Sequence, residues 1–106
     1  MIPEISVAEL QRRHAAGEEL VLLDVREPDE LATASIPWAT AIPMREIPAR
    51  LGELPHEAPI VCMCHHGARS ERVAQFLAAN GYAGAVNLAG GINAWSETID
   101  ATVPRY

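Results

Sequence analysis

The sequence predicts an α/β protein of three layers (α/β/α), with helices on both faces of a central, mainly parallel sheet of about five strands. Short apolar runs of strand length occur at residues 20–24, 59–63 and 85–88. Runs that are apolar throughout are typical of strands buried on both faces. Segments with apolar residues at helical spacing alternate with these runs, as in a parallel sheet. A length of 106 residues predicts one domain, 1–106, with a single core.

The first elements are a helix, a strand and a second, brief helix. Ser6 and Glu9 form a capping box, so a helix is expected from there to Gly17. The run 20–24 is the first long strand. Residues 27–30 carry the acidic first turn of a brief helix, which tolerates a proline because its missing N–H has no helical partner there.

The middle of the chain adds two strands and a helix. Residues 40–43 are a short strand candidate. Apolar residues recur at helical spacing between Arg45 and Leu54, which predicts a helix with Pro48 in its first turn. The run 59–63 is the second long strand, and a loop rich in cysteine and histidine follows it.

The last third repeats the helix and strand alternation. Behind the loop, apolar residues recur at helical period until Asn80 and Gly81 supply a stop signal. The run 85–88 is the third long strand. Gly90–Gly91 is a tight turn, and the last helix is expected to begin at Ile92.

Composition narrows the classes of function. The eight basic residues are all arginine and face fourteen acidic residues, so the net charge is −6, which argues against nucleic acid as a partner. Without lysine, Schiff-base chemistry is excluded. No signal-peptide pattern and no run of about 20 apolar residues occurs, so no membrane association is expected. With two cysteines there is no disulfide framework, and the cytoplasm is the expected location.

The stretch Cys64-His65-His66-Gly67-Ala68-Arg69-Ser70 lies where a parallel α/β sheet places its sites, beyond the carboxyl end of a strand. Cys64 ends the strand, and the next helix is expected to rise at about Arg69 or Ser70. The backbone N–H groups between them are free to point inward, and the helix dipole adds to their field. Gly67 permits a conformation that a side chain would forbid, and Arg69 supplies a fixed cation. A thiol in this ring should ionise readily and attack as a thiolate.

This loop resembles the active-site loop of the rhodanese family, whose pattern is Cys, two variable residues, Gly, one variable residue, Arg, then Ser or Thr. Three further stretches resemble the same family: Leu-Leu-Asp-Val-Arg-Glu at 22–27, Ser-Ile-Pro-Trp-Ala at 35–39 and Leu-Ala-Gly-Gly-Ile-Asn-Ala-Trp at 88–95. The second departs from the usual His-Ile-Pro-Gly-Ala. Together the stretches follow the family's order and spacing across almost the whole chain.

The resemblance implies a single-domain rhodanese-like sulfurtransferase. In that family the cysteine takes a sulfane sulfur from a donor such as thiosulfate, becomes a persulfide, and passes the sulfur to a thiophilic acceptor such as cyanide or a thiol. It implies that Cys64 is the nucleophile and that Arg69 holds the loop or meets the donor's anionic end. The persulfide would lie among the backbone amides of His65, His66, Gly67, Ala68, Arg69 and Ser70. No metal or organic cofactor is implied, and no protein partner is identified.

Neighbouring residues with reactive side chains have simpler interpretations. Cys62 is interpreted as core packing, with a resolving thiol as the alternative. A zinc site is disfavoured because structural zinc usually recruits a second ligand cluster, and the remaining histidines are isolated. His65 and His66 are interpreted as loop residues that raise the local positive potential, especially below neutral pH.

Charged and aromatic residues near the predicted site are also interpreted as structural. Asp24 and Arg26 follow another strand, and ion pairing is expected for both, with Glu30 as a partner for Arg26. Trp95 is assigned to the core. Trp38 is either an exposed partner-binding aromatic or a surface cover.

Three classes of function remain open: a catalytic sulfurtransferase, a phosphatase or arsenate reductase, and a non-catalytic or regulatory sulfur-carrier or binding module. Cysteine phosphatases use Cys-x5-Arg, whereas Cys64 to Arg69 is Cys-x4-Arg. The shorter loop makes a tighter cup, suited to one sulfur atom rather than a tetrahedral phosphate. Binding modules of the rhodanese type commonly lack the cysteine that this sequence keeps.

Overall fold

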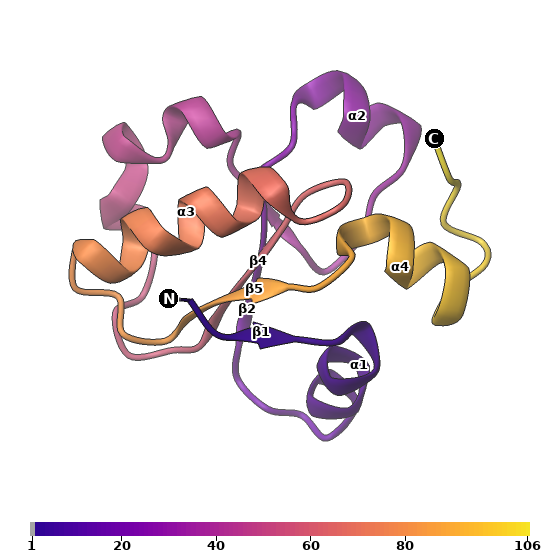
Figure 1. The fold of residues 1–106 in the computed structure, drawn as a ribbon, viewed down its shortest axis with the longest axis horizontal. Helices are drawn as coiled ribbons and strands as arrows, with labels where there is room; N and C mark the ends of the chain where they lie inside the picture. Colours follow the sequence, from indigo (N-terminus) through magenta and orange to yellow (C-terminus); the bar gives the residue numbers. More distant parts are fainter. Residues whose placement is uncertain (1) are drawn as a thin grey trace.

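The computed structural model describes residues 2–106 and contains a five-stranded sheet in which all paired strands are parallel (Figure 1). The strands are β1 (Glu4–Ile5), β2 (Val21–Asp24), β3 (Thr40–Ala41), β4 (Ile60–Met63) and β5 (Ala85–Leu88). Their order across the sheet is β1-β5-β4-β2-β3, so β4 lies at the centre. The parallel α/β fold expected from the alternating pattern is confirmed.

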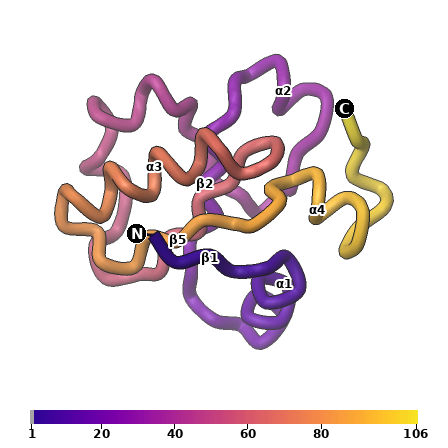
Figure 2. The backbone as a smooth tube through the Cα atoms, viewed as in Figure 1, coloured from indigo at the N-terminus to yellow at the C-terminus, as the bar shows by residue number. Residues whose placement is uncertain are grey.

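Helices cover both faces of the sheet. They are α1 (Val7–Ala15), α2 (Pro28–Thr33), α3 (Ala68–Ala79) and α4 (Gly91–Thr98), with the 3-10 helices η1 (Met44–Glu46) and η2 (Pro48–Glu53). Figures 1 and 2 show α3 and the 3-10 segments on one side of the strands and α1 on the other, where α1 packs against α4.

Two hydrophobic clusters lie on opposite faces of the sheet, because successive strand residues point to opposite sides. Leu22 belongs to the cluster that includes Trp95, whereas Leu23 belongs to the one beneath α3. Val61 and Cys62 divide in the same way. The apolar runs are therefore strands buried on both faces, as predicted, and Trp95 is a core residue.

Strand β1 was not predicted. Glu4 and Ile5 pair with Asn87 and Leu88 of β5 at the edge of the sheet, directly before the capping Ser6. Two residues are too short to show a strand period, and their pairing depends on a strand some eighty positions away in the chain. Only the assembled sheet therefore defines β1.

The helix predicted between Arg45 and Leu54 is wrong in detail. The segment forms η1 and η2, and Arg50 interrupts the second with φ −119° and ψ 17°. Pro48 cannot donate a backbone hydrogen bond, which favours a break before it. Ile47 and Leu54 are nevertheless buried in the core. The apolar spacing thus identified the buried face but not the kind of helix.

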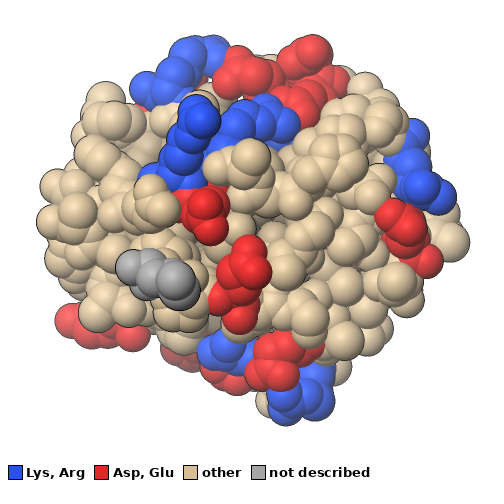
Figure 3. Space-filling view, in the orientation of Figure 1, with Lys and Arg blue, Asp and Glu red and all other residues tan. Residues whose placement is uncertain are grey.

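Charged side chains are closely paired, mostly on the surface. Seven of the eight arginines form ion pairs with carboxylates, and Figure 3 shows basic and acidic side chains side by side. Within residues 2–106, Arg72 is the arginine without an ion pair. None of the helices in this range has the length and apolar character needed to cross a membrane.

Candidate active site

The predicted loop lies at the carboxyl edge of the sheet, between the central strand β4 and helix α3. Asp24 at the end of β2 is in register with Met63, and Cys62 is in register with Asn87 of β5. The segments that follow three adjacent strands therefore meet around Cys64. Helix α3 begins at Ala68, slightly earlier than expected, with Gly67 at its N-cap.

The Cys64 sulfur is surrounded by hydrogen-bond donors. The Gly67 N–H donates to Sγ at 3.1 Å, and the Ser70 Oγ lies 3.3 Å from Sγ. Burial alone would raise the pKa of the Cys64 thiol, but hydrogen bonds from the Ser70 hydroxyl and from the amides of Ser70, Gly67 and Arg69 outweigh it, so the pKa is lowered. The side chain is 1% exposed. The site thus combines an activated thiol with shelter from bulk solvent.

Gly67 gives the loop its shape. Its φ of 123° lies outside the range that L side chains commonly adopt. This conformation turns the chain back, so that the N–H of Gly67 faces the Cys64 sulfur just before α3 begins. The expectation that Gly67 permits an unusual backbone is confirmed.

Arg69 ends a chain of charged side chains that begins in the core. Asp24 accepts hydrogen bonds from Arg26 at 2.9 and 2.7 Å, and both side chains are buried. Arg26 Nη1 donates to the Tyr106 hydroxyl at 2.9 Å, and that hydroxyl donates to Glu30 at 2.8 Å. Glu30 accepts from Arg69 at 2.7 and 2.9 Å. The arginine of the loop is therefore fixed by a carboxylate of α2.

This network corrects one prediction. The ion pair of Asp24 with Arg26 is confirmed, but the Glu30 carboxylate pairs with Arg69, while Arg26 reaches only the Glu30 carbonyl, at 3.4 Å. The hydrogen bonds from Arg69 lower the pKa of Glu30 to about 2, and Glu30 raises the pKa of Arg69. Helix α2 places Glu30 opposite α3, an arrangement that sequence spacing does not reveal.

Asn87 of β5 was missed. Its side chain is 2% exposed, and its Oδ1 lies 2.6 Å from Ser70 Oγ. Its Nδ2 donates to the Gly67 carbonyl at 3.1 Å and to Glu4 at 3.4 Å. A polar residue within an apolar strand was the available signal, because a buried amide needs partners.

The Gly90–Gly91 turn does more than connect β5 to α4. The N–H of Ile92 donates to the Cys64 carbonyl at 2.9 Å, so the first turn of α4 anchors the start of the loop. A Cβ at Gly91 would lie 2.5 Å from the carbonyl oxygens of both Cys64 and His65. Glycine is therefore required there by the close approach of two backbones.

The two histidines differ in environment. His66 is exposed, whereas the His65 ring stacks on Tyr106 with centroids 3.9 Å apart and planes 6° apart. Burial, followed by the neighbouring His66, lowers the pKa of His65. His65 therefore carries less charge than an exposed histidine at the same pH, which weakens the expectation that it raises the positive potential.

Cys62 lies in the core, as expected. It is 0% exposed, and burial raises the pKa of its thiol to about 12. Both cysteines are free thiols. No group of three or more His, Cys, Asp or Glu side chains in residues 2–106 is placed to hold a metal ion.

Trp38 is partly buried. Its ring stacks on His14 at 3.7 Å and meets Trp95 edge-on at 6.2 Å. These contacts favour the surface-cover interpretation over the partner-binding one.

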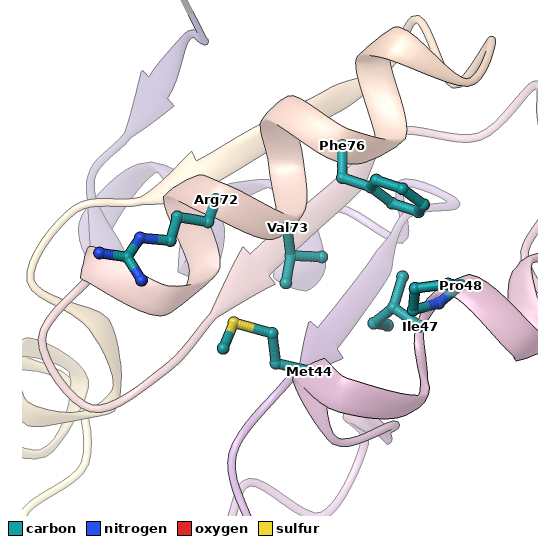
Figure 4. Close-up of a pocket in the computed structure, with 6 residues that line it drawn as sticks. All are labelled: Met44, Ile47, Pro48, Arg72, Val73 and Phe76. Carbon is teal, nitrogen blue, oxygen red and sulfur yellow. The ribbon is translucent and has the colours of Figure 1, made fainter.

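An apolar groove lies beside α3, separate from the residues of the loop. It has a volume of about 190 Å³ and is lined by Met44, Ile47, Pro48, Arg72, Val73 and Phe76. Figure 4 shows Val73 and Phe76 of α3 facing the 3-10 segments, with Arg72 at the end nearer the loop. None of the residues predicted for the site lines this groove.

A sheltered thiol whose pKa is lowered by backbone amides and a hydroxyl, at the carboxyl end of the central strand of a parallel sheet, defines a cysteine-dependent group-transfer domain. The family model described as "Rhodanese-like domain" matches residues 6–98. The chain therefore belongs to the rhodanese-like family.

Known proteins of similar sequence and structure agree with this assignment. A sulfurtransferase of Allochromatium vinosum is 41% identical over 91% of this chain and 90% of its own length. The putative sulfur carrier protein YrkF of Bacillus subtilis is 36% identical over 90% of this chain and 51% of its own length. The solved structure of the human single-domain sulfurtransferase TSTD1 has a TM-score of 0.84 against this fold, with 30% identity, and the match covers 92% of this chain and 98% of that chain. The chain is thus a sulfurtransferase-family protein.

Proposed function

We propose that this protein moves a sulfane sulfur from a small anionic donor such as thiosulfate to cyanide or a thiol, through a persulfide on Cys64. The observation that carries this proposal is the Cys64 sulfur itself, which receives the Gly67 N–H at 3.1 Å and lies 3.3 Å from the Ser70 hydroxyl. Donors in this position stabilise a thiolate and the negative charge of a persulfide. These donors surround the Cys64 sulfur, which supports Cys64 as the nucleophile.

The reaction divides into two transfers. The Cys64 thiolate attacks the outer sulfur of thiosulfate, the Sγ–S bond forms, and sulfite leaves with the electron pair of the broken S–S bond. The acceptor then attacks the outer sulfur of the persulfide, and the electron pair returns to Sγ. Amides of residues 65–70 would hold the charged outer sulfur, and α3 adds the field of its N-terminus.

In this scheme Arg69 either holds the loop in shape or binds the anionic end of the donor, and its contacts favour the first role. Because Glu30 accepts from both terminal guanidinium nitrogens, Nη1 and Nη2, Arg69 fixes the loop against α2. Its charge is also largely balanced by that carboxylate, which reduces its attraction for an anionic donor.

Because Glu30 neutralises much of the Arg69 charge, a second function is also supported: a sulfur carrier that receives its sulfur from another protein rather than from free thiosulfate. Such a carrier would use the same Cys64 persulfide but would turn over thiosulfate slowly. The similarity to a putative sulfur carrier supports keeping this candidate.

The remaining parts of the proposal follow from the chemistry. A reduced thiol is needed, so we place the protein in the cytoplasm, where thiols stay reduced. Its partners would be the small donor and the thiol or cyanide acceptor, with no nucleic acid or membrane.

Intact-mass analysis after thiosulfate treatment tests the proposal. We expect a gain of one sulfur that reductant removes, that is lost in Cys64→Ser, and that persists in the matched control Cys62→Ser. Equal loss in both variants, with the fold intact, would contradict a single nucleophile. Steady-state transfer to cyanide separates the enzyme from a carrier, and turnover of an aryl phosphate without any gain of sulfur would indicate a phosphatase instead.

A further inference from the structure

The Ser70 hydroxyl has more acceptors than it can serve. Its Oγ lies 2.6 Å from Asn87 Oδ1, 3.2 Å from the Gly67 carbonyl and 3.3 Å from Cys64 Sγ. A hydroxyl carries a single hydrogen. Ser70 is 0% exposed and Asn87 2%, so bulk water does not supply a substitute donor. The short distance to Asn87 shows which acceptor the hydrogen favours in this structure.

The direction in which Asn87 points its amide is fixed by its other contacts. Its Nδ2 donates to the Gly67 carbonyl at 3.1 Å and to Glu4 on β1 at 3.4 Å. Both partners accept hydrogen bonds, so the amide nitrogen must face them and Oδ1 must face Ser70. Within residues 2–106, Ser70 is the donor that reaches this oxygen.

The charge on Cys64 determines how much its sulfur needs the same hydrogen. A thiolate only accepts hydrogen bonds, and Ser70 can serve it only by turning away from Asn87 Oδ1, which then lies buried without a donor. A neutral Sγ, in the thiol or in the persulfide where charge resides on the outer sulfur, is a weak acceptor. It does not compete with an amide oxygen at 2.6 Å.

We propose that Asn87 is a positioning residue. Its Oδ1 accepts the hydrogen bond of the Ser70 hydroxyl whenever the Cys64 Sγ is uncharged, and the hydroxyl turns to the sulfur when Cys64 is a thiolate. Asn87 thereby favours the thiol and the persulfide over the thiolate. The persulfide half of this statement rests on the proposed function. When thiolate attack forms the Sγ–S bond and sulfite leaves with the electron pair, Sγ loses its charge and the hydrogen returns to Asn87. When the acceptor removes the outer sulfur, the electron pair returns to Sγ. The Ser70 hydroxyl then donates its hydrogen bond to Sγ again.

Other charged and titratable groups face this region from every side. The arginine that ends the loop is on α3 and its carboxylate partner on α2, Cys62 lies two residues back on β4, and a glutamate of β1 contacts the Asn87 amide. These groups include Glu4, Glu30, Cys62, His65, His66, Arg69 and Tyr106. An Asn87→Leu substitution changes none of these residues, but Glu4 and the Gly67 carbonyl lose the Asn87 Nδ2 as a donor. The same substitution in a Ser70→Ala background therefore separates that loss from the effect on the Ser70 hydrogen.

The pH dependence of Cys64 alkylation by iodoacetamide, located by peptide mass, tests the proposal. Because leucine offers no acceptor to compete with Cys64 for the Ser70 hydrogen, Asn87→Leu should move the alkylation midpoint about one pH unit lower. In a Ser70→Ala background the same substitution should cause no such shift, because the hydrogen in question is gone. Asn80→Leu at the far end of α3 is the matched control and should leave the midpoint unchanged.

Several outcomes would overturn the proposal. An unchanged or raised midpoint in Asn87→Leu, with native circular dichroism, shows that Asn87 does not compete for the hydrogen. A shift of equal size without Ser70 shows that it acts by another route. Asn87→Ala carries the same expectations, and decides the matter if Asn87→Leu does not fold.

The persulfide half has its own measurement. Above the alkylation midpoint, where the free protein is the thiolate, and at a fixed ratio of thiosulfate to sulfite, the ratio of persulfide to free protein should fall about tenfold in Asn87→Leu, which is the equilibrium equivalent of a one-unit shift. An unchanged ratio would overturn this half. Alkylation needs no sulfur donor, so if wild-type protein gains no sulfur at all, the proposed function fails while the alkylation profiles still decide the role of Asn87.

Discussion

Glu30 and Arg69 join α2 to α3 through two parallel hydrogen bonds of 2.7 and 2.9 Å, although they are 39 positions apart in the sequence. A bidentate pair of this kind fixes both the distance and the orientation of the guanidinium. Because Arg69 is part of the first turn of α3, the pair also fixes the loop that surrounds Cys64. The stability of the protein and the shape of its site are therefore coupled through one carboxylate.

The first prediction concerns stability in acid. The pKa of Glu30 is lowered to about 2 by Arg69 in the folded state, whereas its ordinary value is 4.5. The unfolded state therefore binds a proton first as pH falls, so this contribution is complete above about pH 5 and is lost progressively towards pH 2. At about 1.4 kcal/mol per pH unit, its ceiling is about 3.5 kcal/mol. Urea unfolding between pH 2 and 7 measures it.

Glu30→Gln is the variant that isolates this effect. It should be less stable than wild type at pH 7 and should lose less stability on acidification. Glu53→Gln, which removes an exposed partner of Arg50, is the matched control and should leave the acid dependence almost unchanged. Parallel curves for wild type and Glu30→Gln would show that Glu30 does not titrate in this way.

The second prediction concerns the two thiols. Burial raises the pKa of Cys62 to about 12, while hydrogen bonds bring the pKa of Cys64 below its ordinary value despite burial. At neutral pH, alkylation of the folded protein should therefore modify Cys64 at least tenfold faster than Cys62. Peptide mass mapping over time distinguishes them. In denaturant the two thiols should react at similar rates, which provides the reference. Similar rates in the folded protein as well would contradict the assignment.

The third prediction concerns the backbone contact between α4 and the loop. Gly91 has φ +58°, and a Cβ there would lie 2.5 Å from two carbonyl oxygens. Gly91→Ala should therefore destabilise the protein by about 3 kcal/mol or more and reduce Cys64 alkylation, because the loop must shift. Thermal and urea unfolding measure the first effect.

Gly52→Ala is the matched control. Nothing lies within 4 Å of a Cβ built at Gly52. Its stability should change by no more than about 1 kcal/mol in either direction. Similar losses in the two variants would mean that the close approach at Gly91 is not the cause.

The fourth prediction concerns Tyr106. Its hydroxyl connects Arg26 to Glu30, and its ring stacks on His65. Tyr106→Phe keeps the ring but removes the hydroxyl, so the Glu30 pKa should rise and stability should fall by about 1 kcal/mol. The acid limb of the unfolding curve reports the first change.

Tyr82→Phe provides the comparison. Tyr82 donates its hydroxyl to the Leu51 carbonyl at 2.6 Å, and it follows the C-terminal end of α3, whereas Arg69 of this network is in the first turn of that helix. That variant should also lose stability, but its acid limb should keep the shape of the wild type. A Tyr106→Phe acid limb identical to wild type would show that the hydroxyl does not act on Glu30.

Much of the fold could be predicted because its signals are local. The runs at 20–24, 59–63 and 85–88 become strands buried on both faces, since a segment that must be covered on both sides is mainly apolar. The loop could be predicted for the same reason, because the cysteine at the strand end, the glycine and the start of the next helix lie within a few positions of one another. Where the local signal was short or interrupted, as at Glu4–Ile5 and around Pro48, the prediction was absent or wrong.

The sequence by itself determined the parallel α/β fold, the position of Cys64 at the mouth of a strand, and the core location of Cys62, because each depends on residues next to one another. The tertiary structure alone decided which groups surround the sulfur. Asn87 reaches Ser70 because β5 lies beside β4, and Glu30 reaches Arg69 because α2 lies against α3. These contacts depend on strand order and helix placement, and only packing of the whole chain sets both.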